Sequence, residues 1–423
     1  AVSRRHVAMA LRCHGATKMP PSKINIIMFN MSEAYSWQTA PAGSKAEHLR
    51  QGVVNRNFFI LRELQNRTEV NRILSVDFVP LKGPRPFGFK RLLGYYFRNF
   101  IIKREGECVR KSKTARLISR NEKLLEYSSV EAYFNPEKFW KSIQAVAAKY
   151  LNDAPVLIWN YNPFLNDCFR LPCKLKIFDM VDDWSVHPTH HNWCDFLAKA
   201  YRQAGEQADV IFTVSQGLIE KFGERKHVYW VPNGVDLENF TQKLNVPHDI
   251  ENLKKPIIGY AGTIQERVDF DLIKFLLVKN PDKSFVFVGP VRKSVRLEIK
   301  KKLWPLTNVH FLGAKPYGQL PHYVGQFDVA MIPHNQDIFS HSNNPMKMYD
   351  YLATGKKIVS TNVPGMDMFG ELIKVADSAE DFDYKLNQCL SEKDDSLARR
   401  EAVKPHQWAA RVDDMLSKIW TCL

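Results

Sequence analysis

The stretch that decides the fold is FDVAMIP (327–333), followed after a loop by SNNPMKMYDYLATGKKIVST (342–361). Two short apolar runs flank a segment with helical spacing, which predicts strand, loop, helix and strand. Asn344 can cap the helix, Pro345 suits its first position, and Gly355 suits its end. The helix therefore begins at the carboxyl end of a strand with unpaired backbone N–H groups, which favours binding of a diphosphate.

Two charged side chains lie on this predicted helix. Lys347 falls in its first turn and can add positive charge beside a bound anion, and Asp350 follows three residues later on the same face. The Asp350 carboxylate could accept hydrogen bonds from ribose hydroxyls. A capped core helix carrying a solvated Lys–Asp pair explains the same spacing.

The rest of the chain repeats this alternation in two series. At 423 residues the length favours two domains, and apolar strands separated by helices predict parallel sheets covered on both faces. The predicted strands are 24–29, 73–79, 156–160, 175–181, 210–214 and 228–231, then 257–262, 285–289, 309–312, 329–333, 357–361 and 373–375. The fold class is thus α/β, with two Rossmann-like domains whose sheets face a cleft.

Domain limits follow from the polar stretch between the two series. We expect a lead segment at 1–22, whose order stays open, and an N-terminal domain at 23–240. A C-terminal domain is expected at 241–404 and a final helix at 405–423.

Positive charge is concentrated in the first third of the chain. Residues 1–120 hold 23 Lys and Arg against 7 Asp and Glu, whereas the whole chain carries +15. Within it, residues 87–120 interleave aromatic and basic side chains and show no evident strand. A helix lying on anionic lipid fits this pattern, as does a buried crossover helix with basic ends. We expect an anionic membrane surface as the partner and no nucleic acid, because nothing resembles a recognition helix or a stacking sheet.

Composition excludes several classes. No run of about 18 uncharged apolar residues predicts a membrane-spanning helix. Seven cysteines at irregular spacing favour neither a disulfide framework nor structural zinc, and the start of the chain lacks the apolar core of a secretory signal. The expected location is the cytoplasm, on the inner face of the membrane.

Four motifs together resemble one family. NPMKMYDYLATG (344–355) is similar to the nucleotide-sugar segment of GT-B glycosyltransferases of bacterial capsule, exopolysaccharide and teichuronic-acid assembly. VPNGVD (231–236) resembles their interdomain turn, IGYAGT (258–263) the entry to their donor loop, and HQW (406–408) the start of the helix that crosses back to the N-terminal domain. Asp350 stands where the family usually has Glu, which shortens the reach toward ribose. The resemblance covers 205–423 well and 24–205 loosely. It implies that the N-terminal domain (23–240) is acceptor-binding and that the C-terminal domain (241–404) is nucleotide-sugar-binding.

The donor loop supplies further candidates. Gly262 and Thr263 close the predicted strand, and small residues there let a ligand approach the backbone. By resemblance, Arg267 is expected to clamp the diphosphate, since arginine binds phosphate bidentately. A solvated loop arginine is the alternative.

Catalysis is assigned to a pair of carboxylates. Asp182 and Asp183 follow a predicted strand of the first domain, so they face the cleft where a base would activate an acceptor hydroxyl. Asp182 also resembles an aspartate of some inverting members of the family. Either residue could instead cap the following turn. The resemblance implies no metal and no cofactor besides the nucleotide-sugar substrate.

The acceptor side has three candidates. Trp37 and Arg56 belong to the region that lies on the cleft in GT-B proteins, and His187 could contact substrate phosphate. Arg56 could equally be a charge on a helix surface.

These expectations describe a hexosyltransferase-type enzyme. It would move a sugar from a UDP- or GDP-linked donor to a glycan or lipid-linked acceptor in surface polysaccharide synthesis. Two alternatives stay open, a nucleotide-sugar epimerase on a related fold and a non-catalytic protein that binds anionic polymers.

Overall fold

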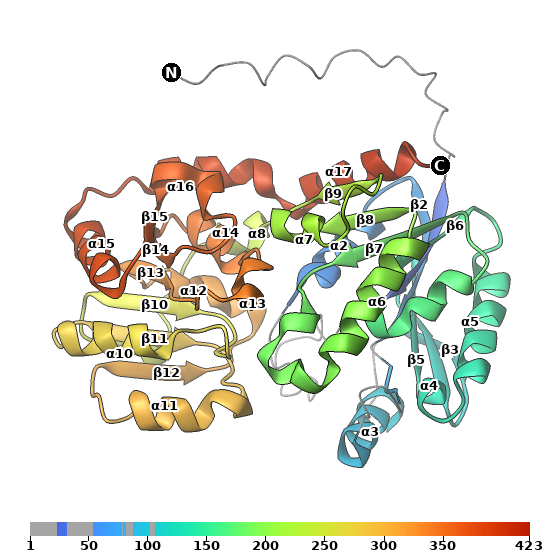
Figure 1. Cartoon of the computed structure of the whole chain (residues 1–423), viewed down its shortest axis with the longest axis horizontal. Coiled ribbons are helices and arrows are strands. Elements are labelled where there is room, and N and C mark those ends of the chain that lie inside the picture. The colour runs from blue at the N-terminus through green and yellow to red at the C-terminus, as the bar shows by residue number, and fades with distance from the viewer. Residues whose placement is uncertain (1–22, 32–53, 78, 82–87, 102–105) are drawn as a thin grey trace, which may run out of the picture.

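A computed structural model describes the chain except residues 1–22, 32–53, 78, 82–87 and 102–105. Two α/β lobes lie side by side, and the last helix runs from the C-terminal lobe across the N-terminal one (Figure 1). The predicted lead segment and Trp37 fall outside the described residues.

The N-terminal lobe is built on one sheet, in the strand order β3-β4-β5-β2-β1-β6-β7-β8-β9. From β5 to β9 neighbouring strands are parallel, whereas β3 and β4 add an antiparallel edge. The strands are β1 (Ile24–Phe29), β2 (Val70–Val76), β3 (Glu107–Lys111), β4 (Ala115–Ser119), β5 (Leu124–Ser129), β6 (Val156–Asn160), β7 (Leu175–Met180), β8 (Val210–Thr213) and β9 (Val228–Trp230).

Helices cover both faces of this sheet because its strands are apolar on both sides. Alternate residues of β1 divide between two cores: Ile26 packs with Phe59 of α2, and Ile27 packs with Phe139 of α5. The helices and short helical turns of this lobe are α2 (Arg56–Gln65), α3 (Phe89–Tyr96), η2 (Phe97–Ile101), α4 (Glu131–Phe134), α5 (Pro136–Tyr150), η3 (Pro163–Arg170), η4 (Trp184–Val186), η5 (Pro188–Trp193), α6 (Cys194–Gln207) and α7 (Gln216–Glu220).

The C-terminal lobe has a fully parallel sheet in the order β12-β11-β10-β13-β14-β15. Its strands are β10 (Ile257–Ala261), β11 (Ser284–Val288), β12 (Val309–Gly313), β13 (Val329–Ile332), β14 (Lys357–Thr361) and β15 (Ile373–Ala376). Its helices are α8 (Leu237–Phe240), α9 (His248–Glu251), α10 (Phe270–Lys279), η6 (Lys293–Val295), α11 (Arg296–Lys302), η7 (Tyr317–Gln319), α12 (Leu320–Val324), α13 (Ile338–His341), α14 (Met346–Ala353), η8 (Met366–Leu372), α15 (Ala379–Ser391), α16 (Ser396–Val403) and η9 (Lys404–His406). Two apolar cores again lie on opposite faces.

One sequence expectation about the fold was wrong. The basic region 87–120 was predicted to lack strands, yet it contains the hairpin of β3 and β4. β4 is almost wholly buried, but the edge strand β3 is mostly exposed and carries charged side chains. A charged edge strand protects a sheet from further pairing, and it hides the apolar alternation by which strands are recognised.

The chain passes between the lobes at the turn after β9. Val231 belongs to the N-terminal core and Val235 to the C-terminal core, so the crossing lies a few residues before the predicted limit at 240. The return crossing is α17 (Trp408–Trp420), which packs against α2 and enters the N-terminal core. This arrangement confirms the predicted C-terminal helix that crosses back.

Candidate functional site

The candidate site is framed by two loops that leave the carboxyl ends of β10 and β13. These loops are tied together by backbone hydrogen bonds, from Asn335 N to Arg267 O at 2.8 Å and from Asp269 N to Pro333 O at 2.9 Å. The side-chain amide of Asn335 also donates to the Glu266 carbonyl at 2.8 Å. Arg267 is therefore fixed beside the strand end that carries His334.

Gly262 brings the backbone of the first loop close to Lys347. Its φ of +141° lies where side chains are rarely accommodated, and a Cβ at this position would sit 3.1 Å from Lys347 Cε. The Lys347 ammonium stands over the Tyr260 ring, 5.0 Å from its centroid. The neighbouring Thr263 is held by its carbonyl, which accepts a hydrogen bond from the Tyr260 hydroxyl at 3.1 Å.

Lys347 is held in a setting that disfavours its charge. Burial and the neighbouring Arg267 lower the pKa of Lys347 to about 7. His334 Nε2 lies 3.5 Å from its ammonium, and burial, with Lys347 and Arg267, lowers the pKa of His334 well below its ordinary value. His334 is consequently neutral at pH 7. Arg267, a lysine of lowered pKa and a neutral imidazole thus lie within each other's electrostatic influence.

Asp350 is the acidic member of the same helix face. Its carboxylate is half-buried, and burial together with Asp236 raises its pKa, an effect that Lys347 opposes. Among the described residues, no group donates a hydrogen bond to the Asp350 carboxylate, so a ligand could still bind it. The contact of Asp350 with ribose remains a prediction.

Arg267 joins the two lobes. Its Nη2 donates to Asp182 Oδ1 of the N-terminal lobe at 2.9 Å, and its guanidinium stacks on the Phe339 ring at 4.0 Å. The residue is 6% exposed, and its Nε has no hydrogen-bond partner among the residues that the structure describes. Two residues predicted for different roles, a base and a diphosphate clamp, are therefore paired with each other.

His187 completes the contact between the lobes. Its ring packs edge-on against Phe339 at 4.3 Å and stacks near His190 at 4.6 Å. Burial, followed by His190 and Arg292, lowers the pKa of His187 to about 4. The imidazole is neutral at pH 7, so the predicted contact with a substrate phosphate would be a hydrogen bond rather than an ion pair.

Asp183 has a different place from Asp182. One carboxylate oxygen accepts from Ser185 N at 2.9 Å and from the Ser185 hydroxyl, and the other pairs with Lys221 Nζ at 2.5 Å. Asp183 caps the short helix η4, as the alternative interpretation of this sequence predicted. Both carboxylate oxygens of Asp183 are therefore occupied within the N-terminal lobe, and Asp183 contacts the other lobe only through its backbone N–H, which donates to Ser342 Oγ at 3.3 Å. Of the two carboxylates, Asp182 is the one that reaches across to the other lobe, where it binds Arg267.

The structure also corrects the placement of Arg56. Its guanidinium is wholly buried beneath the interdomain turn, where it pairs with Asp179 at 3.0 Å and donates to the Val231 carbonyl at 2.9 Å. An acceptor in the cleft cannot reach it. Arg56 instead holds the turn that carries Asn233, whose Oδ1 lies 3.4 Å from Arg56 Nη1.

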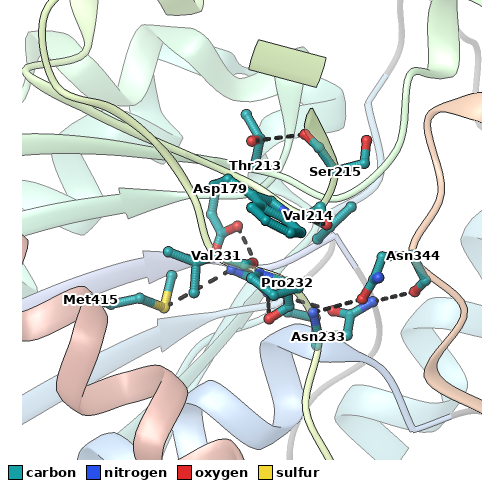
Figure 2. A network of polar contacts seen from close by, with 11 residues as sticks. Asp179, Thr213, Val214, Ser215, Val231, Pro232, Asn233, Asn344 and Met415 are labelled. Carbon is teal, nitrogen blue, oxygen red and sulfur yellow. Dashed lines mark hydrogen bonds and ion pairs between the residues drawn. The ribbon is translucent and has the colours of Figure 1, made fainter. Parts of the chain in front are cut away.

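Asn344 was expected to cap the helix at 346–353, and it does not. Pro345 takes the cap position, while Asn344 faces Asn233 across the lobes (Figure 2). Asn233 N donates to Asn344 Oδ1 at 2.8 Å and Asn233 Nδ2 donates to Asn344 O at 2.7 Å. The Tyr349 hydroxyl donates to the same Oδ1 at 3.0 Å. With its side chain committed to the turn, Asn344 leaves the first N–H groups of α14 without a side-chain cap.

Four further residues were missed by sequence reasoning: Tyr260, Glu266, His334 and Phe339. Each lies near the end of a strand, in the loop after a strand, or shortly before helix α14. Such a position is only a weak sign, in the sequence alone, that a residue belongs to the site. Within the described ranges, no three His, Cys, Asp or Glu side chains gather as a metal site would require. The expectation that no metal is needed remains a prediction.

The architecture defines a class. Two parallel-sheet lobes, joined by one turn and a returning helix, with a site between the carboxyl ends of their strands, constitute the GT-B fold. This confirms the predicted fold class.

Comparison with known proteins agrees with this class. Residues 255–392 match the family model of glycosyl transferases group 1. The putative teichuronic acid biosynthesis glycosyltransferase TuaH of Bacillus subtilis (strain 168) is 30% identical over 201 residues, which cover 44% of this chain and 50% of TuaH. The match therefore spans half the length of that relative.

Solved structures are similar over nearly the whole chain. Anabaena HepE in complex with UDP and glucose has a TM-score of 0.61 at 14% identity, over 94% of this chain and 99% of HepE. A structure described as trehalose-6-phosphate from E. coli bound with UDP-2-fluoro glucose has the same TM-score at 10% identity, over 94% and 99%. These likenesses establish the GT-B fold, and residues 255–392 of the second lobe match the group 1 glycosyl transferase model.

Proposed function

We propose that this chain is a glycosyltransferase that moves a sugar from a nucleoside-diphosphate sugar, UDP-linked in the first instance, onto an acceptor hydroxyl in surface polysaccharide synthesis. The observation that carries the proposal is that Lys347, in the first turn of the uncapped helix α14, lies within the electrostatic influence of Arg267, which is itself bound to Asp182 of the other lobe. The names of TuaH and of the UDP-bound neighbours support the choice of reaction and donor.

Positive charge would serve the leaving group. As the bond between the sugar's anomeric carbon and the diphosphate oxygen breaks, the nucleoside diphosphate leaves with the electron pair and gains charge. Arg267, Lys347 and the first N–H groups of α14 are groups of the chain that can stabilise this charge. Thr263, Gly262 and Pro345 would shape the backbone around it, and Asp350 would accept hydrogen bonds from the ribose.

Asp182 would serve the acceptor. The acceptor oxygen forms the new bond to the anomeric carbon, and its proton passes to the Asp182 carboxylate. Because Asp182 is paired with Arg267, the diphosphate must replace it on the guanidinium before the carboxylate is released. Donor binding and activation of the base are then the same event. The glycan or lipid-linked acceptor, the inner face of an anionic membrane and the cytoplasmic location belong to this proposal as well.

A panel of nucleotides tests the donor site. In thermal shift with UDP, GDP, ADP and CMP, one diphosphate should stabilise the protein by about 2.7 kcal/mol at 100 times its Kd. Lys347→Met keeps the side-chain volume and should remove most of that shift. The matched control is Lys301→Ala, an exposed lysine of α11 in the same lobe, which should leave the shift unchanged.

Three results would contradict the proposal. A shift that survives Lys347→Met would show that the diphosphate binds elsewhere. Conversion of the donor sugar without any acceptor would indicate an epimerase. No response to any nucleotide, with salt-dependent binding to anionic polymers, would indicate a non-catalytic binding protein.

A further inference from the structure

One helical segment of the N-terminal lobe has two unlike faces. α3 (Phe89–Tyr96) continues into the π-helix η2 (Phe97–Ile101), because Phe97 keeps helical angles at the junction. The inner face is buried: Leu92, Tyr95 and Phe100 pack with Val130 in a small core separate from the main ones. The segment is thus anchored to the lobe and projects from its lower edge (Figure 1).

The outer face carries a row of exposed apolar side chains, here called the apolar ridge. Phe89, Leu93, Phe97 and Ile101 are 72%, 51%, 56% and 60% exposed. They recur every fourth residue, so they follow one face of the helix over roughly 18 Å at the usual rise of an α-helix. Single exposed apolar residues are ordinary, but four on consecutive turns form a patch that indicates a partner.

The charge of this part of the sequence indicates the partner's chemistry. The stretch 78–104 contains seven Lys and Arg and no Asp or Glu. Lys90 of this stretch is exposed on the same segment as the ridge. An apolar stripe among cations suits the interface of an anionic bilayer, where the stripe meets acyl chains and the cations meet headgroups. A second copy of the chain would place like charges against each other, which disfavours self-association through this face.

Topology relates the ridge to the site. The segment lies in the connection that leaves the carboxyl end of β2, and Asp182 lies just past the carboxyl end of β7 in the same sheet. β2 and β7 belong to the parallel part of the sheet, so both connections leave by one edge. A membrane that receives the ridge therefore faces the edge from which the candidate base projects.

We propose that the apolar ridge inserts into the headgroup–acyl boundary of an anionic membrane and that the exposed Lys90 contacts its headgroups. Insertion of the ridge needs no nucleotide sugar, but its purpose, delivery of a lipid-linked acceptor to Asp182, rests on the proposed function. In the described part of the chain no helix is long and apolar enough to cross a bilayer, so contact through this ridge is contact at the interface.

Flotation of the full chain with vesicles tests the ridge. Vesicles of phosphatidylcholine mixed with phosphatidylglycerol should bind the protein, and vesicles of phosphatidylcholine alone should bind it poorly. Leu93→Ser with Phe97→Ser should weaken partitioning into the anionic vesicles about tenfold or more, because two buried apolar side chains are lost from the contact. High salt should weaken it further.

The control exploits a second exposed apolar pair in a basic setting. Leu297 and Trp304 are 81% and 63% exposed, next to the lysines of α11 in the other lobe. Leu297→Ser with Trp304→Ser should leave flotation unchanged. Both double variants should keep the parent's melting temperature and its stabilisation by UDP, which separates a lost membrane contact from a damaged fold.

Several outcomes would overturn the inference. Flotation of the ridge variant like the parent would do so, as would equal loss in the control variant or equal binding to neutral vesicles. A parent that is dimeric, does not float and becomes monomeric in the ridge variant would assign the ridge to a second copy. If the parent floats but no nucleotide stabilises it, the membrane inference stands and the donor proposal fails.

Discussion

Protonation of Lys347 should affect the stability of the ligand-free protein and the affinity for the donor in opposite directions. Its pKa of about 7 means that the protein alone gains little by carrying the proton, because burial and Arg267 both act against the charge. In the unfolded chain the ordinary pKa is 10.5, so the unfolded state binds more protons between these two values. Stability of the ligand-free protein should therefore rise as pH increases from 7 toward 10.5.

Donor binding should have the opposite pH dependence. A diphosphate favours the charged lysine, so above pH 7 binding must take up a proton, and Kd for UDP should rise by up to about tenfold per pH unit. Calorimetric titration at pH 6 to 9, in buffers of different ionisation enthalpy, measures both Kd and the proton uptake. In Lys347→Met both should become flat across this range. An equally steep profile in that variant would assign the titration to another group.

At the same scale, sequence predicted which residues lie near one another better than it predicted their hydrogen-bond partners. Asp182, Arg267, Lys347 and Gly262 lie in one region, because each belongs to a loop that follows a strand or to the first turn of a helix. The cap assigned to Asn344 was wrong because Asn233, a residue more than a hundred positions away, takes its side chain. Local rules cannot see such a competitor.

Among the elements, the close approach of β10 and β11 at their carboxyl ends shapes the donor loop. Gly289 has φ of +148°, and a Cβ there would lie 2.0 Å from the Gly262 carbonyl oxygen. Gly262 N in turn donates to Val288 O at 2.8 Å. The loop that faces Lys347 is therefore fixed by a glycine of the neighbouring strand.

Gly289→Ala should damage this junction severely. The contact is with backbone and the φ is unsuited to alanine, so we expect a loss of about 3 kcal/mol or more in unfolding free energy. Gly318→Ala is the matched control, because a Cβ there meets nothing within 4 Å and φ is not in the left-handed region. Its effect should stay below about 1 kcal/mol. Urea denaturation measures both, and similar losses would contradict the steric argument.

Strands that are buried on both faces were easier to predict from the sequence than strands at the exposed edge of a sheet. Strands covered on both faces, such as Val156–Asn160 and Lys357–Thr361, were located to the residue, because a continuous apolar run between helices has one interpretation. The hairpin Glu107–Ser119 was missed since its outer strand is charged and its inner strand carries the buried Arg116. This hairpin joins the sheet through its hydrogen bonds to neighbouring strands, and no apolar alternation in its sequence indicates this.

At the scale of the whole molecule, the returning helix couples the lobes. Trp408 opens α17 and stacks on Phe59 of the N-terminal lobe, with ring centroids 4.9 Å apart. Its backbone N–H meanwhile donates to Val235 O at 3.2 Å in the turn between the lobes. One residue thus contacts α2 and the interdomain turn together.

Trp408→Ala should uncouple the lobes as well as weaken them. Loss of this wholly buried ring should cost about 3–5 kcal/mol. In differential scanning calorimetry we expect a single transition of the parent to separate into two, the N-terminal lobe melting first. Leu397→Ala on α16, a residue 68% exposed, should leave the trace unchanged. A uniform downward shift of one transition in Trp408→Ala would show that the coupling lies elsewhere.

In the ligand-free protein, the Asp182 carboxylate already serves as the counter-ion of Arg267. When a diphosphate arrives, one anion is exchanged for another on the same guanidinium, so only part of its charge is newly neutralised. Association should then depend less on ionic strength than two unpaired cations would dictate. If Asp182 is the base, as proposed above, its carboxylate would stay bound to arginine until a donor displaces it.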